Sequence, residues 1–329
     1  MTAENPIGLV LGSAVAPEDV PGAAATAEAC GFDELWLAED YFFTGGIAGA
    51  SLVLGNTSNI TVGIGVVSAV ARHPALLAME LSTLARVYED RLIAGIGLGV
   101  PAWGRQMGLH PRSPLSALRE CVTTTKSLLR GETVDLRGDV FAFNDVNLVY
   151  PETGTPTPIR MGVIGPKMLQ LSGEVADGSV LSVSAGHDYV RWAKARIEEG
   201  RARGGRTDAH PITVFAIYAV DEDGAAARAS ARAKLAFYRQ NGSNGLTDVY
   251  GISDQMDALV KQGGYEAILQ GMPEQWVEDL TIAGTPEECA AKISAFYAAG
   301  ADSVALFPVA TDRTEEIIRL TADQVLPRL

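Results

Sequence analysis

Apolar runs alternate with helical patterns along the whole chain of 329 residues, and this alternation restricts the fold more than any other feature of the sequence. Most of the runs are continuously apolar, which is typical of parallel strands covered on both faces. Eight such strands, each followed by a helix, predict an α/β fold closed into a (β/α)8 TIM barrel. The expected strands cover residues 7–12, 33–38, 60–67, 91–97, 159–164, 178–184, 212–220 and 302–308.

Two insertions interrupt the repeat. Residues 132–150 alternate in polarity around Arg137–Gly138, which predicts a hairpin before the fifth strand. Residues 222–283 contain alanine-rich helical patterns and a break rich in glycine and asparagine, which predicts a helical insertion before the eighth strand. We therefore expect one barrel domain over residues 1–329, with insertions on loops that shape its mouth.

The charge and the hydropathy of the chain restrict its partners. A net charge of −14 disfavours nucleic-acid binding, because such binding depends on Lys and Arg side chains that neutralise phosphates. No apolar run approaches the roughly 20 residues that a membrane helix requires. The first residues, MTAENPIGLVLG, lack the basic flank of a signal peptide. We expect a cytoplasmic protein that acts on a small molecule, without a membrane or nucleic-acid partner.

The residues at the expected strand ends disfavour several chemistries. Active sites of such barrels lie at the C-terminal ends of the strands. These ends hold no lysine for a Schiff base, no His/Asp metal cluster and no Ser-His-Asp arrangement. Cys30, Cys121 and Cys289 lie far apart, so we expect neither disulfides nor a metal site. Glycine, serine and apolar residues predominate instead, which favours a large flat cofactor that carries its own chemistry.

Two glycines mark possible binding positions. Gly65 lies inside the third strand, where glycine indicates either a bulge at the barrel rim or close approach by another group. Gly165 precedes Pro166 where the fifth strand turns into a helix. The free N–H groups of that helix start suit a phosphate, with Ser182 and Ser184 of the next strand as hydroxyl donors. The alternative is a plain strand-to-helix turn.

Four segments carry a resemblance to a known family. They are RHP (72–74), RLIAGIGLG (91–99), MGVIGPKMLQLSGEVADGSVLSVS (161–184) and GTPEECAAKISAFYAAGADSVALF (284–307). They resemble the bacterial luciferase-like superfamily, and within it the deazaflavin-dependent branch that includes methylenetetrahydromethanopterin reductase. The similarity extends from about residue 7 to 327, and the block that starts at residue 161 is its most specific part.

The resemblance implies a binding mode for coenzyme F420. In that branch a non-prolyl cis peptide, which matches Gly65–Val66, lies behind the deazaflavin ring. Ile164–Gly165 and Ser182 would hold the phosphate, and Arg72 and His73 would support the bulge. Asp40 would lie near the polar edge of the ring, although its position also suits a helix cap. Family members are usually dimers or tetramers, so a homo-oligomer is expected.

The implied function is that of an F420-dependent oxidoreductase that transfers hydride to a small organic acceptor, such as an imine or an activated ring. Asp40 and Tyr41 are the expected catalytic residues. The alternatives are an FMN-dependent monooxygenase on the same barrel and a barrel that binds a ligand without catalysis. Val10, Tyr41 and Val100 depart from the methanopterin reductases and glucose-6-phosphate dehydrogenases of the branch, so neither substrate is expected. An acceptor site for an aromatic ring, or ordinary loop packing, would involve Tyr41, Phe42, Phe43, Trp103, Arg105 and His110.

Overall fold

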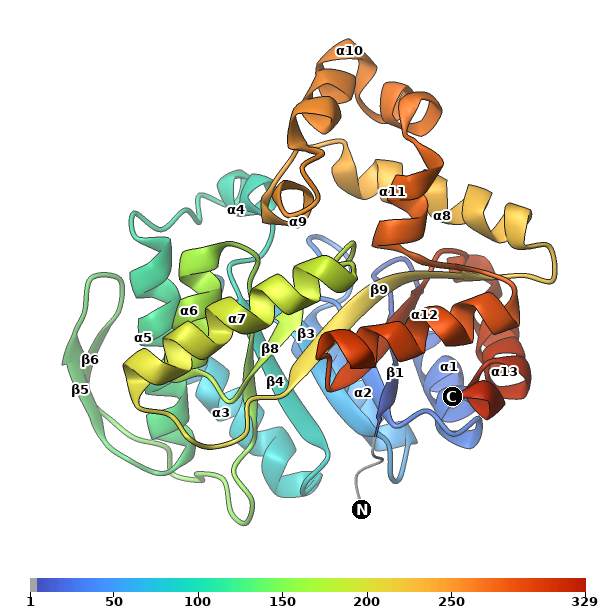
Figure 1. Ribbon diagram of the computed structural model, residues 1–329. Coiled ribbons are helices and arrows are strands. Elements are labelled where there is room, and N and C mark those ends of the chain that lie inside the picture. The colour runs from blue at the N-terminus through green and yellow to red at the C-terminus, as the bar shows by residue number, and fades with distance from the viewer. Residues whose placement is uncertain (1–4) are drawn as a thin grey trace.

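The computed structural model describes residues 5–329, and its centre is a closed barrel of eight parallel strands (Figure 1). Each strand pairs in parallel with its neighbours, and the pairing of β8 with β9 closes the ring. The expected TIM barrel is therefore confirmed. The barrel strands are β1 (Ile7–Leu11), β2 (Glu34–Leu37), β3 (Thr61–Ser68), β4 (Leu92–Gly97), β7 (Ile159–Gly162), β8 (Gly178–Leu181), β9 (Ile212–Val220) and β11 (Ser303–Pro308).

Two aromatic rings fill much of the barrel interior. Trp36 of β2 and Phe215 of β9 meet edge to face, with ring centroids 5.4 Å apart. Val10, Val180 and Phe307 pack against them in the same cluster. Rings this large bury apolar area from strands on opposite sides of the barrel, so they contribute strongly to its closure.

An outer layer of helices covers the barrel (Figure 1). Their apolar faces follow the helical repeat, as in α1, where Val20, Ala23, Ala24 and Ala27 are buried. The helices of this layer are α1 (Val20–Ala29), α2 (Gly46–Asn56), α3 (Pro74–Val87), α5 (Pro114–Leu129), α6 (Pro166–Val175), α7 (His187–Gly204), α12 (Pro286–Ala299) and α13 (Thr314–Gln324). Short helices α4 (Pro101–Gln106), η1 (Thr311–Arg313) and η2 (Leu326–Arg328) complete the loops.

The first insertion is the expected hairpin. Strands β5 (Val134–Arg137) and β6 (Ala142–Val146) pair antiparallel within residues 132–150. The carboxylate of Glu120 on α5 accepts the backbone N–H groups of Asp139, Val140 and Phe141, at 2.7, 3.1 and 2.9 Å. This one carboxylate thus ties the hairpin turn to the outer layer of the barrel.

The second insertion stands above the C-terminal ends of the strands (Figure 1). It contains α8 (Gly224–Arg239), α9 (Gly245–Asp248), α10 (Ser253–Gly271) and α11 (Glu274–Leu280). It also contains a strand that the sequence did not predict, β10 (Ile282–Gly284). This strand forms because β9 continues past its pairing with β8, which ends at Val214, and leaves a free edge for Ile282–Gly284.

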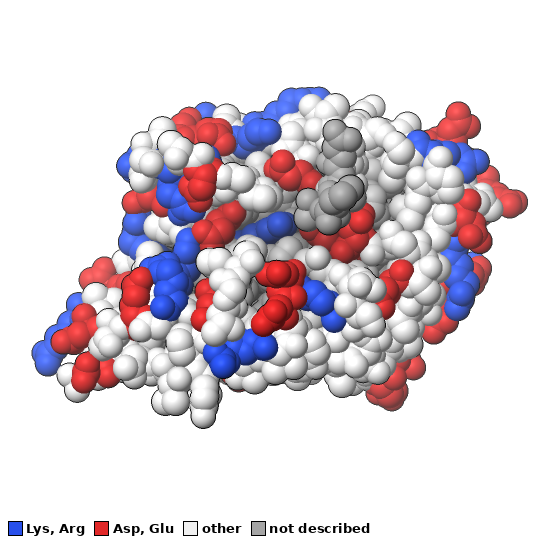
Figure 2. Space-filling model, turned by 90° about the horizontal axis from the view of Figure 1, so that it is seen from below, with Lys and Arg blue, Asp and Glu red and all other residues white. Residues whose placement is uncertain are grey.

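The surface at the N-terminal ends of the strands carries charges of both signs, interspersed (Figure 2). Within residues 5–329, no helix is long and apolar enough to span a bilayer. The same residues contain no cluster of three or more His, Cys, Asp or Glu side chains suited to a metal ion.

Candidate functional site

A cavity of about 440 Å³ opens at the C-terminal ends of the barrel strands. This volume lies within the range of roughly 300–1,000 Å³ that is common for small-molecule sites. Its walls come from six strands or the loops after them, so the barrel itself fixes its shape. The lining residues are Glu39, Asp40, Gly65, Val66, Leu98, Gly99, Val100, Pro101, Trp103, Gly162, Val163, Ile164, Gly165, Met168, Val180, Ser182 and Phe215.

The expected cis peptide bond is present at Gly65–Val66. The register between β3 and β4 shifts between Ile64 and Val67, so the bond lies in a bulge. The bulge turns the Val66 side chain over two glycines of neighbouring strands. A Cβ atom at Gly97 would lie 2.6 Å from a Val66 methyl group, and one at Gly162 would lie 2.7 Å from the other. Val66 therefore packs closely over β4 and β7 and also lines the cavity.

The space beside Gly65 is occupied by Phe215. A Cβ atom at Gly65 would lie 2.5 Å from Cζ of Phe215, and one at Gly63 would lie 2.2 Å from the Trp36 ring. Both glycines are thus required by the aromatic rings that fill the barrel, before any ligand is considered. Packing against Phe215 is therefore a second reason for glycine at residue 65, beside the expected approach of a bound ring to the backbone.

Asp40 follows β2 and lines the cavity. Its carboxylate accepts a hydrogen bond from the hydroxyl of Ser13. Burial raises the pKa of Asp40, while the bond from Ser13 and the positive charge of Lys234 oppose this shift. The alternative that Asp40 caps a helix is wrong. The first amide of α2, that of Gly46, donates instead to Glu39, at 2.9 Å.

Arg72 and His73 have different roles. Arg72 donates to both carboxylate oxygens of Glu39, at 2.8 and 2.6 Å, and so ties the loop after β3 to the end of β2. His73 accepts the amide of Ala75 at the start of α3, at 3.3 Å. Its ring packs 4.7 Å from that of Phe143 in the hairpin. His73 therefore supports the outer layer, and Arg72 supports the mouth.

Tyr41 belongs to an aromatic rim beside the cavity. A second depression of about 350 Å³ contains Tyr41, Phe42 and Phe43, and it shares Glu39 and Asp40 with the cavity. Burial raises the pKa of the Tyr41 hydroxyl, and the neighbouring Ser68 opposes this shift. Among residues 5–329 the hydroxyl has no hydrogen bond of normal geometry.

The rim is partly open to solvent. Phe42 and Phe43 are 67% and 64% exposed, although both are large apolar side chains. Trp103 of α4 lies with its ring centroid 6.2 Å from that of Tyr41. Arg105 and His110 are exposed and line neither depression. Of the six residues expected at the acceptor site, the structure thus brings the four aromatic ones to the mouth.

The start of α6 faces the cavity on the other side. Gly165 is the residue before the helix and Pro166 is its first residue, as expected. A Cβ atom at Gly165 would meet nothing within 4 Å. The N–H groups of Gly165 and Lys167 donate no hydrogen bond within residues 5–329. This open helix start, with its partial positive charge, suits an anion.

The position of α6 is fixed by α7. A Cβ atom at Gly200 would lie 1.8 Å from the carbonyl oxygen of Gln170, so the two helices touch through their backbones. The hydroxyl of Tyr189 also donates to the carbonyl of Ile164, at 2.6 Å. The turn that carries Gly165 is therefore held rigidly against the barrel.

The two serines lie differently. Because β8 ends at Leu181, both serines are in the loop after the strand rather than in the strand itself. Ser182 lines the cavity. Ser184 does not line it. It is 1% exposed, has a φ of 71°, and its hydroxyl has no hydrogen-bond partner within residues 5–329.

Sequence reasoning missed Lys234. It lies on α8 with its ammonium 5.1 Å from the ring centroid of Phe307, and its charge acts on Asp40. Burial lowers the pKa of Lys234, and Asp40 opposes this shift. The surrounding letters AKLAFYR indicate only an amphipathic helix. No local signal reveals that the insertion folds back over the mouth.

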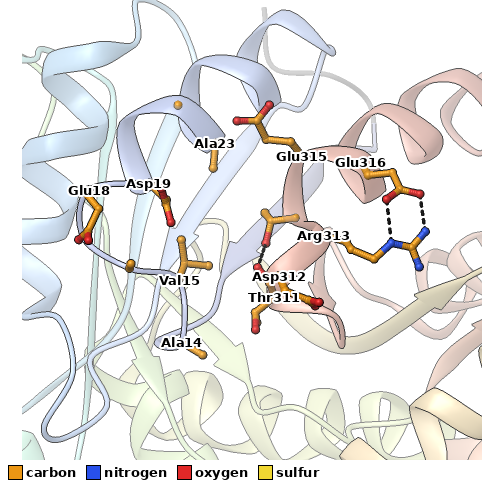
Figure 3. A pocket seen from close by; sticks show the side chains of 13 residues that line it. Ala14, Val15, Glu18, Asp19, Ala23, Thr311, Asp312, Arg313, Glu315 and Glu316 are labelled. Atoms are coloured by element: carbon orange, nitrogen blue, oxygen red, sulfur yellow. Dashed lines mark hydrogen bonds and ion pairs between the residues drawn. The ribbon is translucent and has the colours of Figure 1, made fainter.

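A larger depression of about 670 Å³ lies outside the barrel, between α1 and the start of α13 (Figure 3). It shares no residue with the cavity. Glu18, Asp19, Asp312 and Glu315 give it several carboxylates, while the Arg313 side chain donates to Glu316 at 2.7 Å. An acidic wall of this kind disfavours an anionic cofactor.

Comparison with known proteins shows the family of the chain. The family model described as luciferase-like monooxygenase matches residues 2–303. The chain belongs to this family. Luciferase-like relatives include a 5,10-methylenetetrahydromethanopterin reductase of Methanolobus tindarius, 27% identical over 92% of this chain and 94% of that protein. An F420-dependent glucose-6-phosphate dehydrogenase of Microbacterium testaceum is 24% identical over 95% and 94%.

A solved structure agrees over the full length of this luciferase-like chain. The coenzyme F420 dependent tetrahydromethanopterin reductase from Methanopyrus kandleri superposes with a TM-score of 0.86 at 25% identity, covering 99% of each chain. The expected similarity to the deazaflavin-dependent branch is therefore confirmed.

Proposed function

We propose that the chain is an oxidoreductase that uses coenzyme F420 to transfer hydride to a small organic acceptor, with an imine or an activated ring as the preferred electrophile. One observation carries this proposal. A single cavity joins the Gly65–Val66 bulge to the open helix start at Gly165, in a chain whose full-length relatives include F420-dependent enzymes. A flat ring and an anionic tail require these two features at opposite ends of one site.

The residues present fit this cofactor. Val66, Val180 and Phe215 offer apolar surfaces for a ring, and Gly165 leaves room for a phosphate that a side chain would fill. Asp40 offers a polar group at the rim, fixed by Ser13. The bound deazaflavin supplies a carbon that carries hydride, so the chain needs few acids and bases of its own.

The side chains at the mouth then orient the acceptor. Tyr41, Phe42, Phe43 and Trp103 form a surface on which a planar acceptor can stack, opposite the Gly65–Val66 bulge. Holding two reacting groups in contact contributes several kcal/mol to such a transfer, roughly 7–11 in well-oriented systems. We assign Asp40 and the unpartnered hydroxyl of Tyr41 to hold or deliver a proton at the acceptor heteroatom.

An FMN-dependent monooxygenase is the second candidate, and the name of the family model favours it. The two functions differ in their need for oxygen. A deazaflavin has carbon in place of the nitrogen at which reduced flavin reacts with oxygen, so it transfers hydride without oxygen.

An anaerobic screen tests the proposal. Purified protein is mixed with reduced F420 and candidate imines, nitroaromatic rings and ketones, and the return of deazaflavin fluorescence is followed. We expect turnover without oxygen, and deuterium at the carbon of the labelled deazaflavin should appear in the product. Turnover that requires reduced FMN and consumes oxygen would assign the chain to the second candidate.

A further inference from the structure

Arg239, the last residue of α8, is a buried cation without an anionic partner. It is 5% exposed. Its guanidinium has five N–H donors, but within residues 5–329 it makes one hydrogen bond, to the side-chain carbonyl of Asn244 at 3.2 Å. Its Nε is buried without a partner, and it forms no ion pair with residues 5–329. Burying a charge in this state is costly unless a ligand completes the pair.

The other buried arginines differ from it. Burial lowers the pKa of Arg160, but the nearby carboxylates of Glu34 and Asp302 oppose this shift. Arg201 pairs with Glu198 at 3.3 Å. Burial lowers the pKa of Arg239 to about 10, and no carboxylate opposes this shift. Among residues 5–329, Arg239 is thus the buried arginine that lacks a nearby carboxylate.

The contacts of Arg239 lead to the start of α6. The side-chain oxygen of Asn244 accepts a hydrogen bond from the Arg239 guanidinium and another from the backbone N–H of Leu246, at 3.0 Å. These two bonds fix the Asn244 side chain at the start of α9. The next residue, Gly245, lies against Ile164. A Cβ atom at Gly245 would be 3.4 Å from the carbonyl oxygen of Ile164. Helix α9 stands over the barrel (Figure 1), and Ile164 and Gly165 line its cavity.

A second unpartnered group lies in the neighbouring loop. The Ser184 hydroxyl is buried without a hydrogen-bond partner within residues 5–329. Val183, the residue before Ser184, and Tyr238, the residue before Arg239, pack against the same apolar cluster. The loop after β8 and the end of α8 therefore converge on one part of the barrel mouth. Arg239 and Ser184 thus directly follow residues that pack against one cluster, and the contact of Gly245 with Ile164 brings the start of α9 next to the turn before α6.

We propose that Arg239 is the cationic ligand of a phosphate group held by the start of α6. The phosphate oxygens accept N–H groups that the Arg239 guanidinium leaves unused, together with the amides of Gly165 and Lys167. Arg–phosphate pairs are strong because two parallel N–H groups match two oxygens. This inference rests on the proposed function only for the identity of the ligand, which is then the phosphodiester of F420.

A titration with two ligands tests the role of Arg239. F420 is compared with the deazaflavin riboside that lacks the phosphate and the tail. Arg239→Met should weaken F420 binding by about 30-fold or more, because loss of one partner of a buried charge pair is costly. The affinity for the riboside should stay unchanged. Arg232→Met is the matched control on the same helix, since Arg232 already pairs with Glu274 at 2.6 Å, and it should change neither affinity.

Thermal unfolding gives a readout that does not depend on the deazaflavin. Inorganic phosphate should raise the Tm of the wild type and of Arg232→Met, but not that of Arg239→Met. Without ligand, Arg239→Met should be at least as stable as the wild type, because it removes an unpaired buried charge. Arg239→Gln, which keeps a donor for Asn244, should show the same loss of phosphate response.

Three results would overturn the inference. They are wild-type affinity for F420 in Arg239→Met, an equal loss of affinity for F420 and the riboside, and an unchanged phosphate response. If the wild type binds neither deazaflavin, the proposed function fails. The phosphate response still decides the role of Arg239 in that case, so the two failures are distinguishable.

Discussion

At the scale of single residues, the site depends on where side chains are absent. Gly65 leaves room for Phe215, and Gly97 and Gly162 leave room for Val66. Gly165 differs from these three because no atom of the protein occupies the space that its side chain would fill. The first three glycines are therefore required by packing, and we propose ligand binding as the role of Gly165.

This difference predicts the effect of substitutions at Gly165. Gly165→Asp should fold normally but lose cofactor binding, because it places bulk and negative charge where an anion binds. Gly165→Ala is the matched control. Its φ of −78° suits any residue and its side chain meets no atom within 4 Å, so its Tm should stay close to that of the wild type. Fluorescence titration with F420 gives both affinities. If a folded Gly165→Asp protein bound F420 with wild-type affinity, the proposal that the phosphate binds at Gly165 would be wrong.

The sequence predicted Gly65 as a special position but not its full cause. The strand pattern around residue 65 and the family resemblance both marked it, and the cis bond is present. The contact with Phe215 lies 150 residues away in the chain, on β9, and no local pattern encodes it. The same reason explains why Lys234 and Arg239 were missed. Lys234 acts on Asp40, and Arg239 contacts Asn244, from an insertion whose path is decided by tertiary packing.

At the scale of elements, a polar chain joins three neighbours at the N-terminal side of the barrel. Ser172 of α6 and Ser179 of β8 share a hydrogen bond at 2.8 Å, and Ser179 meets Nε2 of His210 at 2.9 Å, just before β9. Burial lowers the pKa of His210 to about 4, and Arg201 and Arg206 act in the same direction. The folded state thus favours the neutral form of the His210 imidazole.

The position of His210 predicts a pH dependence of stability. A histidine whose folded pKa is lowered stabilises the fold above its ordinary pKa of 6.5, and this contribution is lost as the pH falls toward 4. The full effect is about 3 kcal/mol. His210→Gln should therefore lose less unfolding free energy than the wild type over this window, as measured by urea unfolding at several pH values. Parallel pH curves for the two proteins would contradict the assignment.

Element types followed from the sequence more reliably than element ends. The predicted strands 159–164 and 178–184 end earlier in the structure, at Gly162 and Leu181. The residues beyond these ends turn into the loops that line the cavity, so regular strand pairing stops where the cavity begins. Strand β10 was missed because three residues give no pattern without the free edge of β9.

At the scale of the whole molecule, the barrel and its helical insertion contribute different residues. The barrel strands and the loops after them line the cavity, and α8 of the insertion carries Lys234 and Arg239. The barrel order could be predicted because each parallel strand is buried on both faces and followed by a helix. The path of the helical insertion could not be predicted, because its helical pattern does not show in which direction the chain returns to the barrel.

The central claim is that this cavity binds a deazaflavin that carries a phosphate. The most direct measurement is a calorimetric titration of one protein preparation with F420 and, separately, with FMN. We predict one F420 bound per chain, with an affinity at least about tenfold higher than for FMN, a difference of roughly 1.4 kcal/mol. Tighter binding of FMN, or no binding of F420, would contradict the account.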